Sequence, residues 1–525
     1  MHRLRTFPQP PPQDSGATPG LSACTCLPAV VQSAATARRH RQRRLRQSPS
    51  SRIVQTALLC MLLSACAVGP RFTLPKTALP ARFAAAPQNA PPAWPRRDWW
   101  RGFGSPELDQ LITEAETHNF SIRIAIAQLQ AANAEAEIAG APLLPAVNGN
   151  ASADAQRYGS GAAPLVQPGS GGQLAYTHQS AVSAQVSYEL DFWGKNRDAL
   201  RAAEANAAAS RFNRDTVALT AVSAVASTWF QILADRDGLS IAKKNLAASE
   251  ELLAQLRAEL GAGVVNAGVV AQQAALAAGE RATIPGLQSQ LHQQEIALGI
   301  LVGKPPEMLT LAPATLDTLH MPVLMPGLPS ALLTRRPDIA QAEAVLIAAN
   351  ANVRGAIAAF FPSISLTGSA GWQSTALDRL FTPGSSLLSA AASLSQPLFE
   401  GGALSGQLSV NRATYRQDVA IYQQAVVKAF SDVETALTAL HFATEQEQQE
   451  QIAVERADYA LRAVEAQLQA GTVNLGSVLI AQQTLLGDQN AFEQARLARF
   501  LAAVNLYQAL GGGWRAPAHS LLAGG

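Results

Sequence analysis

Apolar and small polar residues alternate with a period of two in two parts of this chain. In residues 182–190 the even positions are apolar or aromatic and the odd positions are Ser, Gln or Glu. Residues 363–372 alternate in the same way, with Ser or Thr between apolar positions. Such alternation predicts strands that are apolar on one face and wet on the other. With the neighbouring segments we expect four strands, at 146–158, 176–192, 363–373 and 386–399.

Helical segments precede and follow each predicted strand pair. The Ala-rich stretch 106–140 begins at Ser105-Pro106-Glu107, which supplies an N-cap, a first-turn proline and an acid, and it stops before Pro142. A second Ala-rich helix is expected to start at the motif formed by Arg335, Arg336, Pro337 and Asp338, and to stop before Pro362. Pro337 and Asp338 suit the first turn of this helix.

Two very long helices are predicted after the strand pairs. Residues 195–260 contain no proline, and none lies between Pro397 and Pro517. At 1.5 Å per residue, such a helix reaches about 100 Å. Each is expected to end at a G-x-V-N-x-G motif, from which a shorter helix returns. We expect the glycines of this motif to supply positive φ and its asparagine to tolerate it.

The second half of the chain repeats the first. Residues 339–351 match 122–134 without a gap, and the turn motif at 471–478 matches the one at 263–270. A period above 200 residues is too long for a solenoid and indicates one duplicated half-domain. An extension with a signal peptide is predicted at 1–65, and an extended lipidated segment at 66–105. The first repeat is predicted at 106–304 and the second at 328–514, with a linker at 305–327 between them. A tail at 515–525 follows.

The amino-terminal leader has the features of a bacterial signal peptide. Residues 1–65 carry nine Arg, no Lys and one acid, although the formal charge of the whole chain is only +2. Arginines precede an apolar stretch at 53–63 that is too short to span a bilayer. It ends in Leu-Ser-Ala-Cys, which resembles the lipobox of lipoproteins, so we expect a covalent lipid on Cys66. The alternative is an ordinary signal peptide with a chance cysteine.

The predicted strands carry an implication for assembly. Strand edges cannot be hydrated in a membrane, so a sheet there must close, and the smallest closed barrels use about eight strands. Four strands from one chain therefore predict that two or more chains share a barrel. The long Ala-rich helices agree, because small residues let helices pack closely against neighbours.

Several motifs together resemble those of the TolC/OprM/NodT-type outer-membrane efflux proteins. They are C-A-V-G-P (66–70), L-L-T-R-R-P-D-I (332–339), F-F-P-S-I-S-L (360–366), Q-P-L-F-E-G-G (396–402) and L-Y-Q-A-L-G-G-G-W (506–514). The resemblance implies a mixed α/β membrane protein with internal duplication. It also implies a homotrimer with a 12-stranded transmembrane β-barrel, four strands per chain, continued by a long periplasmic α-helical barrel.

In function, the resemblance implies the passive exit channel of a tripartite efflux pump in the cell outer membrane. Such a channel conducts drugs or other small molecules and works with a periplasmic adaptor (membrane fusion) protein. The expected inner-membrane transporter is of the resistance-nodulation-division type. The implied surroundings include outer-membrane lipid and no nucleic acid.

By the same resemblance, the turn motifs point into the periplasm, dock the adaptor and narrow the tunnel. The docking residues would be Gly263, Val265, Asn266, Gly268, Gly471, Val473, Asn474 and Gly476. Many family members have an acid at the position of Ser477, and some have one at the position of Ile480; these acids form a ring that narrows the pore. This chain has neither acid, so it lacks such a ring. We instead expect a neutral constriction at Asn474, Ser477 and Ile480 and doubt a cation selectivity located there.

Neither the catalytic motifs nor the cysteines indicate an enzyme. Gly299-x-x-x-Gly303-Lys304 is one residue short of a P-loop, and H-E-x-x-H and G-x-S-x-G motifs are absent from the sequence. No cysteine follows Cys66, and we expect no catalytic residue, no metal and no cofactor beyond the lipid. Two alternatives stay open: an outer-membrane duct for an ATP-driven peptide or protein secretion system, and a periplasmic adaptor or scaffold lipoprotein.

Overall fold

The computed structural model describes residues 68–77, 80, 82–84, 94–158, 175–322 and 329–516. These residues belong to one compact unit that spans Ala65–Gly525. The signal peptide and Cys66 lie outside the described residues, so the predicted lipidation is not addressed by the structure.

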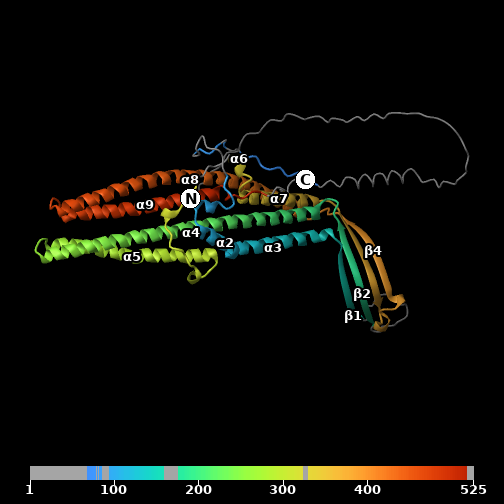
Figure 1. The fold of residues 1–525 in the computed structure, drawn as a ribbon. Helices are drawn as coiled ribbons and strands as arrows, with labels where there is room; N and C mark the ends of the chain where they lie inside the picture. Colours follow the sequence, from blue (N-terminus) through green and yellow to red (C-terminus); the bar gives the residue numbers. More distant parts are fainter. Residues whose placement is uncertain are drawn as a thin grey trace, which may run out of the picture. The chain divides into compact units, whose positions relative to one another are not determined.

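Each repeat contains a helical lead, a strand pair and a long helical hairpin (Figure 1). The first repeat comprises α2 Pro106–His118, α3 Phe120–Gly140, η2 Ala141–Leu143, β1 Ala146–Tyr158, β2 Ala175–Leu190, α4 Lys195–Gly261 and α5 Ala267–Val302. The second comprises α6 Pro329–Leu332, α7 Pro337–Ala358, β3 Ser363–Ser374, η5 Leu377–Arg379, η6 Pro383–Ser385, β4 Ser386–Ser395, α8 Ala403–Gln469 and α9 Leu475–Ala509. Short 3-10 helices lie before and between the repeats, η1 Trp99–Phe103, η3 Pro306–Met308 and η4 Leu316–Thr318.

The four strands form one antiparallel sheet in the order β1-β2-β3-β4. Within the described part of this single chain, β1 and β4 are edge strands, as expected if four strands cannot close a barrel alone. The register aligns most apolar positions of the four strands on one face; for example, Val182 is opposite Ala151 and Trp372, whereas Leu387 lies on the other face. The other face carries hydroxyl, amide and carboxylate groups, and the hydroxyl pairs Ser365–Ser393 and Ser369–Ser389 are 2.6 and 2.7 Å apart. An apolar outer face and a polar inner face are what a membrane barrel needs.

The two long hairpins confirm the predicted duplication. Helices α4 and α8 each have 67 residues, and α5 and α9, which return from them, have 36 and 35. Figure 1 shows both hairpins running away from the end of the helices where the sheet lies. One apolar window of α4 is long enough to cross a membrane, but half of it is buried against the rest of the chain. Trp229, Phe230 and Leu233 of α4 lie in the largest hydrophobic core.

Alanine pairs allow the two repeats to pack closely. Ala348 and Ala351 of α7 form a buried cluster with Ala202 and Ala205 of α4. Because these side chains are single methyl groups, the two helix backbones can approach each other closely. The Ala-Ala-Asn-Ala sequence at 348–351, which matches 131–134 of the first repeat, is therefore part of the contact between the repeats.

The predicted single helix at 106–140 is wrong, because the chain breaks at Asn119 into α2 and α3. The Asn119 side chain accepts a hydrogen bond from the backbone N–H of Ile122 and so caps α3. Its Nδ2 atom also donates to the carbonyl of Leu301, at 2.6 Å, near the end of α5. This second bond joins residues far apart in the sequence, so no local pattern could reveal it.

The end of the extended segment before the first repeat contributes to the main core. Trp99, Trp100 and Phe103 are all buried. The Trp99 ring stacks on Tyr507 of α9, with centroids 4.6 Å apart. Residues before the first repeat therefore help to hold the end of the second repeat in place.

Candidate functional site

The turns at the two hairpin tips have the same backbone geometry. Gly263 and Gly471 have φ of 75° and 70°, a region that glycine enters at little cost. Asn266 and Asn474 are extended, with φ of −91° and −95°, so the prediction that they would tolerate positive φ is wrong. Each asparagine is instead the N-cap of the returning helix, and its side chain accepts from the backbone N–H of Val269 or Ser477.

The second glycine of each motif lies inside the returning helix and has another role. A Cβ atom added to Gly268 or Gly476 would lie 3.1 Å from the Oδ1 atom of the capping asparagine. A side chain at this position would therefore crowd the oxygen that caps the helix. The motif combines a glycine for the turn, an asparagine for the cap and a glycine that leaves room for the cap.

Apolar side chains hold the two tips together. Leu256, Leu475 and Val478 are buried in one cluster, and Val265 packs against it. Val264, in contrast, is 72% exposed and Ile480 is 67% exposed. Within the described residues, the tip therefore presents apolar side chains that no part of the same chain covers.

Replacing Asn474 by alanine is expected to loosen the first turn of α9. The substitution removes the acceptor for the Ser477 N–H, and losing such a cap costs about 1 kcal/mol. Amide hydrogen exchange should show faster exchange in residues 475–480, with little change in the body of the hairpin. Gln483→Ala, at an exposed position further along α9, is the control. Unchanged exchange at Ser477 would show that the cap does not stabilise the tip.

The proposed constriction residues lie in the first two turns of α9 and at its N-cap. Asn474 and Ile480 are exposed, and Ser477 is half-buried. The structure therefore leaves two of the three side chains accessible in a single chain. All three are uncharged, so they add no charge to the tip.

The helix-start motif of the second repeat is a buried ionic centre. Arg336, whose side chain is only 10% exposed, binds Asp338 through two nitrogens, at 3.0 and 2.7 Å. It also contacts Asp432 of α8 at 3.0 Å and donates to the carbonyl of Ala509 at 3.1 Å. Pro337 begins α7, as predicted. Arg336 therefore ties the start of α7 to α8 and to the end of α9, a role the sequence pattern did not reveal.

A second ionic cluster joins α4, α8, α9 and η4, which lies between the two repeats. Arg496 of α9 contacts Glu447, Glu493 and Asp317. Burial, followed by the neighbouring carboxylate of Asp237, raises the pKa of Glu493 to about 7. Sequence reasoning missed this cluster because its members come from four separate elements.

Stability should fall as pH rises through the range in which Glu493 ionises in the folded chain. An unfolded chain loses this proton near the ordinary pKa of 4.5, whereas the folded chain keeps it until about 7. The contribution of Glu493 to the free energy of unfolding is therefore greatest below pH 4.5 and is lost between pH 4.5 and 7. Glu493→Gln should stabilise the protein at pH 8 by roughly 1–3 kcal/mol per chain and change little at pH 4.5. Thermal unfolding at both pH values, with the exposed Glu445→Gln as control, measures this difference.

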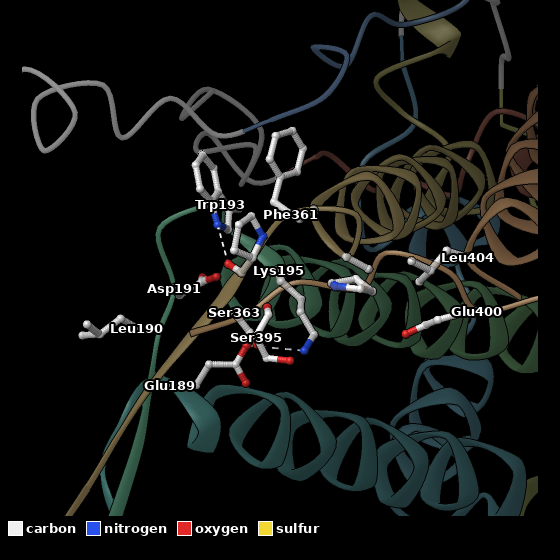
Figure 2. A pocket seen from close by; sticks show the side chains of 14 residues that line it. Glu189, Leu190, Asp191, Trp193, Lys195, Phe361, Ser363, Ser395, Glu400 and Leu404 are labelled. Atoms are coloured by element: carbon white, nitrogen blue, oxygen red, sulfur yellow. Dashed lines mark hydrogen bonds and ion pairs between the residues drawn. The ribbon is translucent and has the colours of Figure 1, made fainter. Parts of the chain in front are cut away.

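The sheet meets the helices at a polar pocket of about 320 Å³ (Figure 2). Asp191 accepts from the backbone N–H groups of Asn196 and Arg197 and thereby caps α4. The Trp193 indole donates to the carbonyl of Pro362 at 2.8 Å. These contacts fix the β2–α4 connection against the start of β3.

Comparison with known proteins decides the family. The profile of the outer membrane efflux protein family matches residues 111–304 and 328–512, and so includes both repeats. The chain belongs to the outer membrane efflux protein family. It is accordingly the outer-membrane exit channel of a tripartite efflux pump, a trimeric barrel whose tunnel extends into the periplasm. Both the fold and the function implied by the sequence motifs are confirmed.

Individual members show how far the similarity extends. The chain is 37% identical over 468 residues to the pyoverdine export outer membrane protein OpmQ of Pseudomonas aeruginosa, covering 88% of this chain and 97% of OpmQ. It is 31% identical to the probable efflux pump outer membrane protein TtgC of Pseudomonas putida, covering 88% and 96%. Among solved structures, the open-state MtrE channel of Neisseria gonorrhoeae superimposes with a TM-score of 0.77 at 29% identity, covering 87% of this chain and all of MtrE.

Members of this family are channels that work with periplasmic adaptors and inner-membrane transporters.

Proposed function

We propose that three lipidated copies of this efflux protein form the outlet for a secreted small organic molecule, pyoverdine or a compound of similar chemistry. The observation that carries the proposal is the similarity to OpmQ, which is named for pyoverdine export and matches over 97% of its own length. The polar sheet face supports it, because hydroxyl and amide side chains suit a cargo that forms hydrogen bonds.

Cys66 carries the covalent lipid in this proposal, and no other cofactor is involved. The motif Leu-Ser-Ala-Cys and the apolar stretch before it support acylation. Acyl chains add to membrane affinity with every buried methylene group, and the barrel supplies the rest. Metabolic labelling with an alkyne fatty acid tests the modification, and Cys66→Ala should abolish the label.

The periplasmic partners bind at the two tips. The adaptor would contact Gly263, Val265, Asn266 and Gly268 of the first turn, and Gly471, Val473, Asn474 and Gly476 of the second. The matching geometry of both turns supports two similar docking sites per chain. The proposed transporter behind the adaptor is of the resistance-nodulation-division type.

A photo-crosslinking amino acid at position 264 tests these partners in living cells. Val264 is 72% exposed at the tip, whereas Ile300, 69% exposed near the far end of α5, is the matched control. An adaptor peptide crosslinked from position 264 alone, with a co-purifying proton-driven transporter, supports the proposal. An ATP-driven transporter in the same complex would contradict the transporter class and leave the docking site standing.

The cargo is tested by complementation. A Pseudomonas aeruginosa strain that lacks OpmQ should regain export of pyoverdine, measured by its fluorescence in the medium, when this chain is expressed. The Glu445→Gln variant, an exposed change on α8 outside both the sheet and the tip turns, controls for expression. If a correctly assembled trimer restores nothing, the proposed cargo is wrong although the family assignment holds.

A further inference from the structure

The pocket at the junction of sheet and helices is lined partly by residues of the polar face of the sheet. Glu189 is opposite Ser365 in the register and therefore belongs to the polar face of the sheet. Ser363 and Ser395, which also line the pocket, are opposite each other at the end of the same face. In Figure 2, Glu189, Ser363 and Ser395 gather on one side of the strands, and Leu190 points away. Because the apolar face must contact lipid, the face that carries Glu189, Ser363 and Ser395 is turned toward the interior of the barrel.

Two carboxylates in the pocket are available to a ligand. Glu189 contacts Lys195 at 3.4 Å, and these side chains are 36% and 51% exposed, so the pair is open to exchange with another cation. Glu400 is exposed and lines the same pocket, and no hydrogen bond or ion pair to its carboxylate occurs within the described residues.

Asp191 and Trp193, which also line the pocket, are already engaged by other groups of the chain. Asp191 is used for capping α4 and for its ion pair with Arg197 at 3.2 Å. The Trp193 ring stacks on Phe361, with centroids 4.8 Å apart, and its N–H is held by Pro362. The pocket is thus preformed within one chain, with one aromatic wall and an excess of negative charge on the opposite side.

We propose that this pocket is a binding site for an organic ammonium group of a molecule passing through the channel. One ammonium would contact Glu400, and a second amine of the same ligand would compete with Lys195 for Glu189. The stacked Trp193 and Phe361 would lie beside the apolar part of the ligand. Charge selection in this efflux protein would then lie at the base of the barrel, in place of the acidic ring that is missing at the tip. The inference rests on the proposed function only in requiring a conducting trimer.

Spermidine serves as the probe in planar bilayers that contain the purified trimer. Spermidine should block the current, and Glu400→Gln should raise the half-blocking concentration by about fivefold. Lys195→Gln should lower that concentration, because it removes the competing ammonium. Glu189→Gln is a second carboxylate variant in case Glu400→Gln assembles poorly.

Asp154→Asn is the matched control, since Asp154 is opposite Gln179 on the same polar face but does not line the pocket. Equal weakening by Asp154→Asn and Glu400→Gln would show diffuse charge attraction and overturn the site. Absence of block in a trimer with normal unblocked conductance would also overturn it, while leaving the channel itself intact. Loss of conductance without spermidine would instead count against the channel, so the two failures are distinguishable.

Discussion

Replacing Arg336 by alanine is expected to destabilise each chain by roughly 2–4 kcal/mol and to reduce the yield of assembled trimer sharply. The guanidinium holds Asp338, Asp432 and the carbonyl of Ala509 at once, and only a tenth of its side chain is exposed. Its removal leaves two carboxylates close together and a cavity between three helices. Both carboxylates are about one-third exposed, which limits the loss. Thermal unfolding in detergent measures the loss of stability, and gel analysis of unheated samples measures the yield of trimer.

The adjacent arginine provides the matched control. Arg335 lies over the ring of Trp94, with its guanidinium carbon 4.6 Å from the centroid, and such contacts contribute about 0.5–1 kcal/mol at exposed sites. Arg335→Ala should therefore change the melting temperature much less than Arg336→Ala. Arg336→Lys should recover only part of the loss, because lysine cannot bind a carboxylate through two nitrogens. Equal effects of the alanine variants would show that Arg336 does not join these helices.

Replacing Ile480 by aspartate is expected to convert the channel to strong cation selectivity at its tip. In a trimer, the substitution places three carboxylates at the level of the proposed constriction, and their field raises the local concentration of cations. The cation-to-anion permeability ratio, measured from reversal potentials across a salt gradient, should rise several-fold over the wild type. High salt should reduce the change, because it screens exposed charges.

Val264→Asp separates a constriction from general charging of the tip. Val264 is as exposed as Ile480 but belongs to the turn of the other hairpin. It should change the permeability ratio far less than Ile480→Asp if the narrow point lies at Ile480. Equal shifts from both variants would refute a constriction at Asn474, Ser477 and Ile480.

The regular elements could be predicted because their signals are local. Successive side chains of a strand point to opposite faces, so a strand leaves an alternating pattern in the sequence. The first strand is predicted at 146–158, and β1 occupies Ala146–Tyr158. The long helices follow from the absence of proline, and their ends follow from glycines that adopt positive φ. In contrast, the sequence does not predict the break at Asn119, whose side chain caps α3 and also bonds to Leu301, 182 residues away.

The sequence by itself determined the duplication, the four amphipathic strands, the two long hairpins and the need for several chains. These features arise from periodicity and from residues that allow or prevent helix, which act over a few positions. Only the tertiary structure decided which charged groups meet. It joined Arg336 to Ala509, gathered Glu493 with carboxylates from other elements, and placed Glu189 beside Lys195 in a pocket that Glu400 also lines. Ionic contacts have no period along the chain, so they emerge only when distant elements pack together.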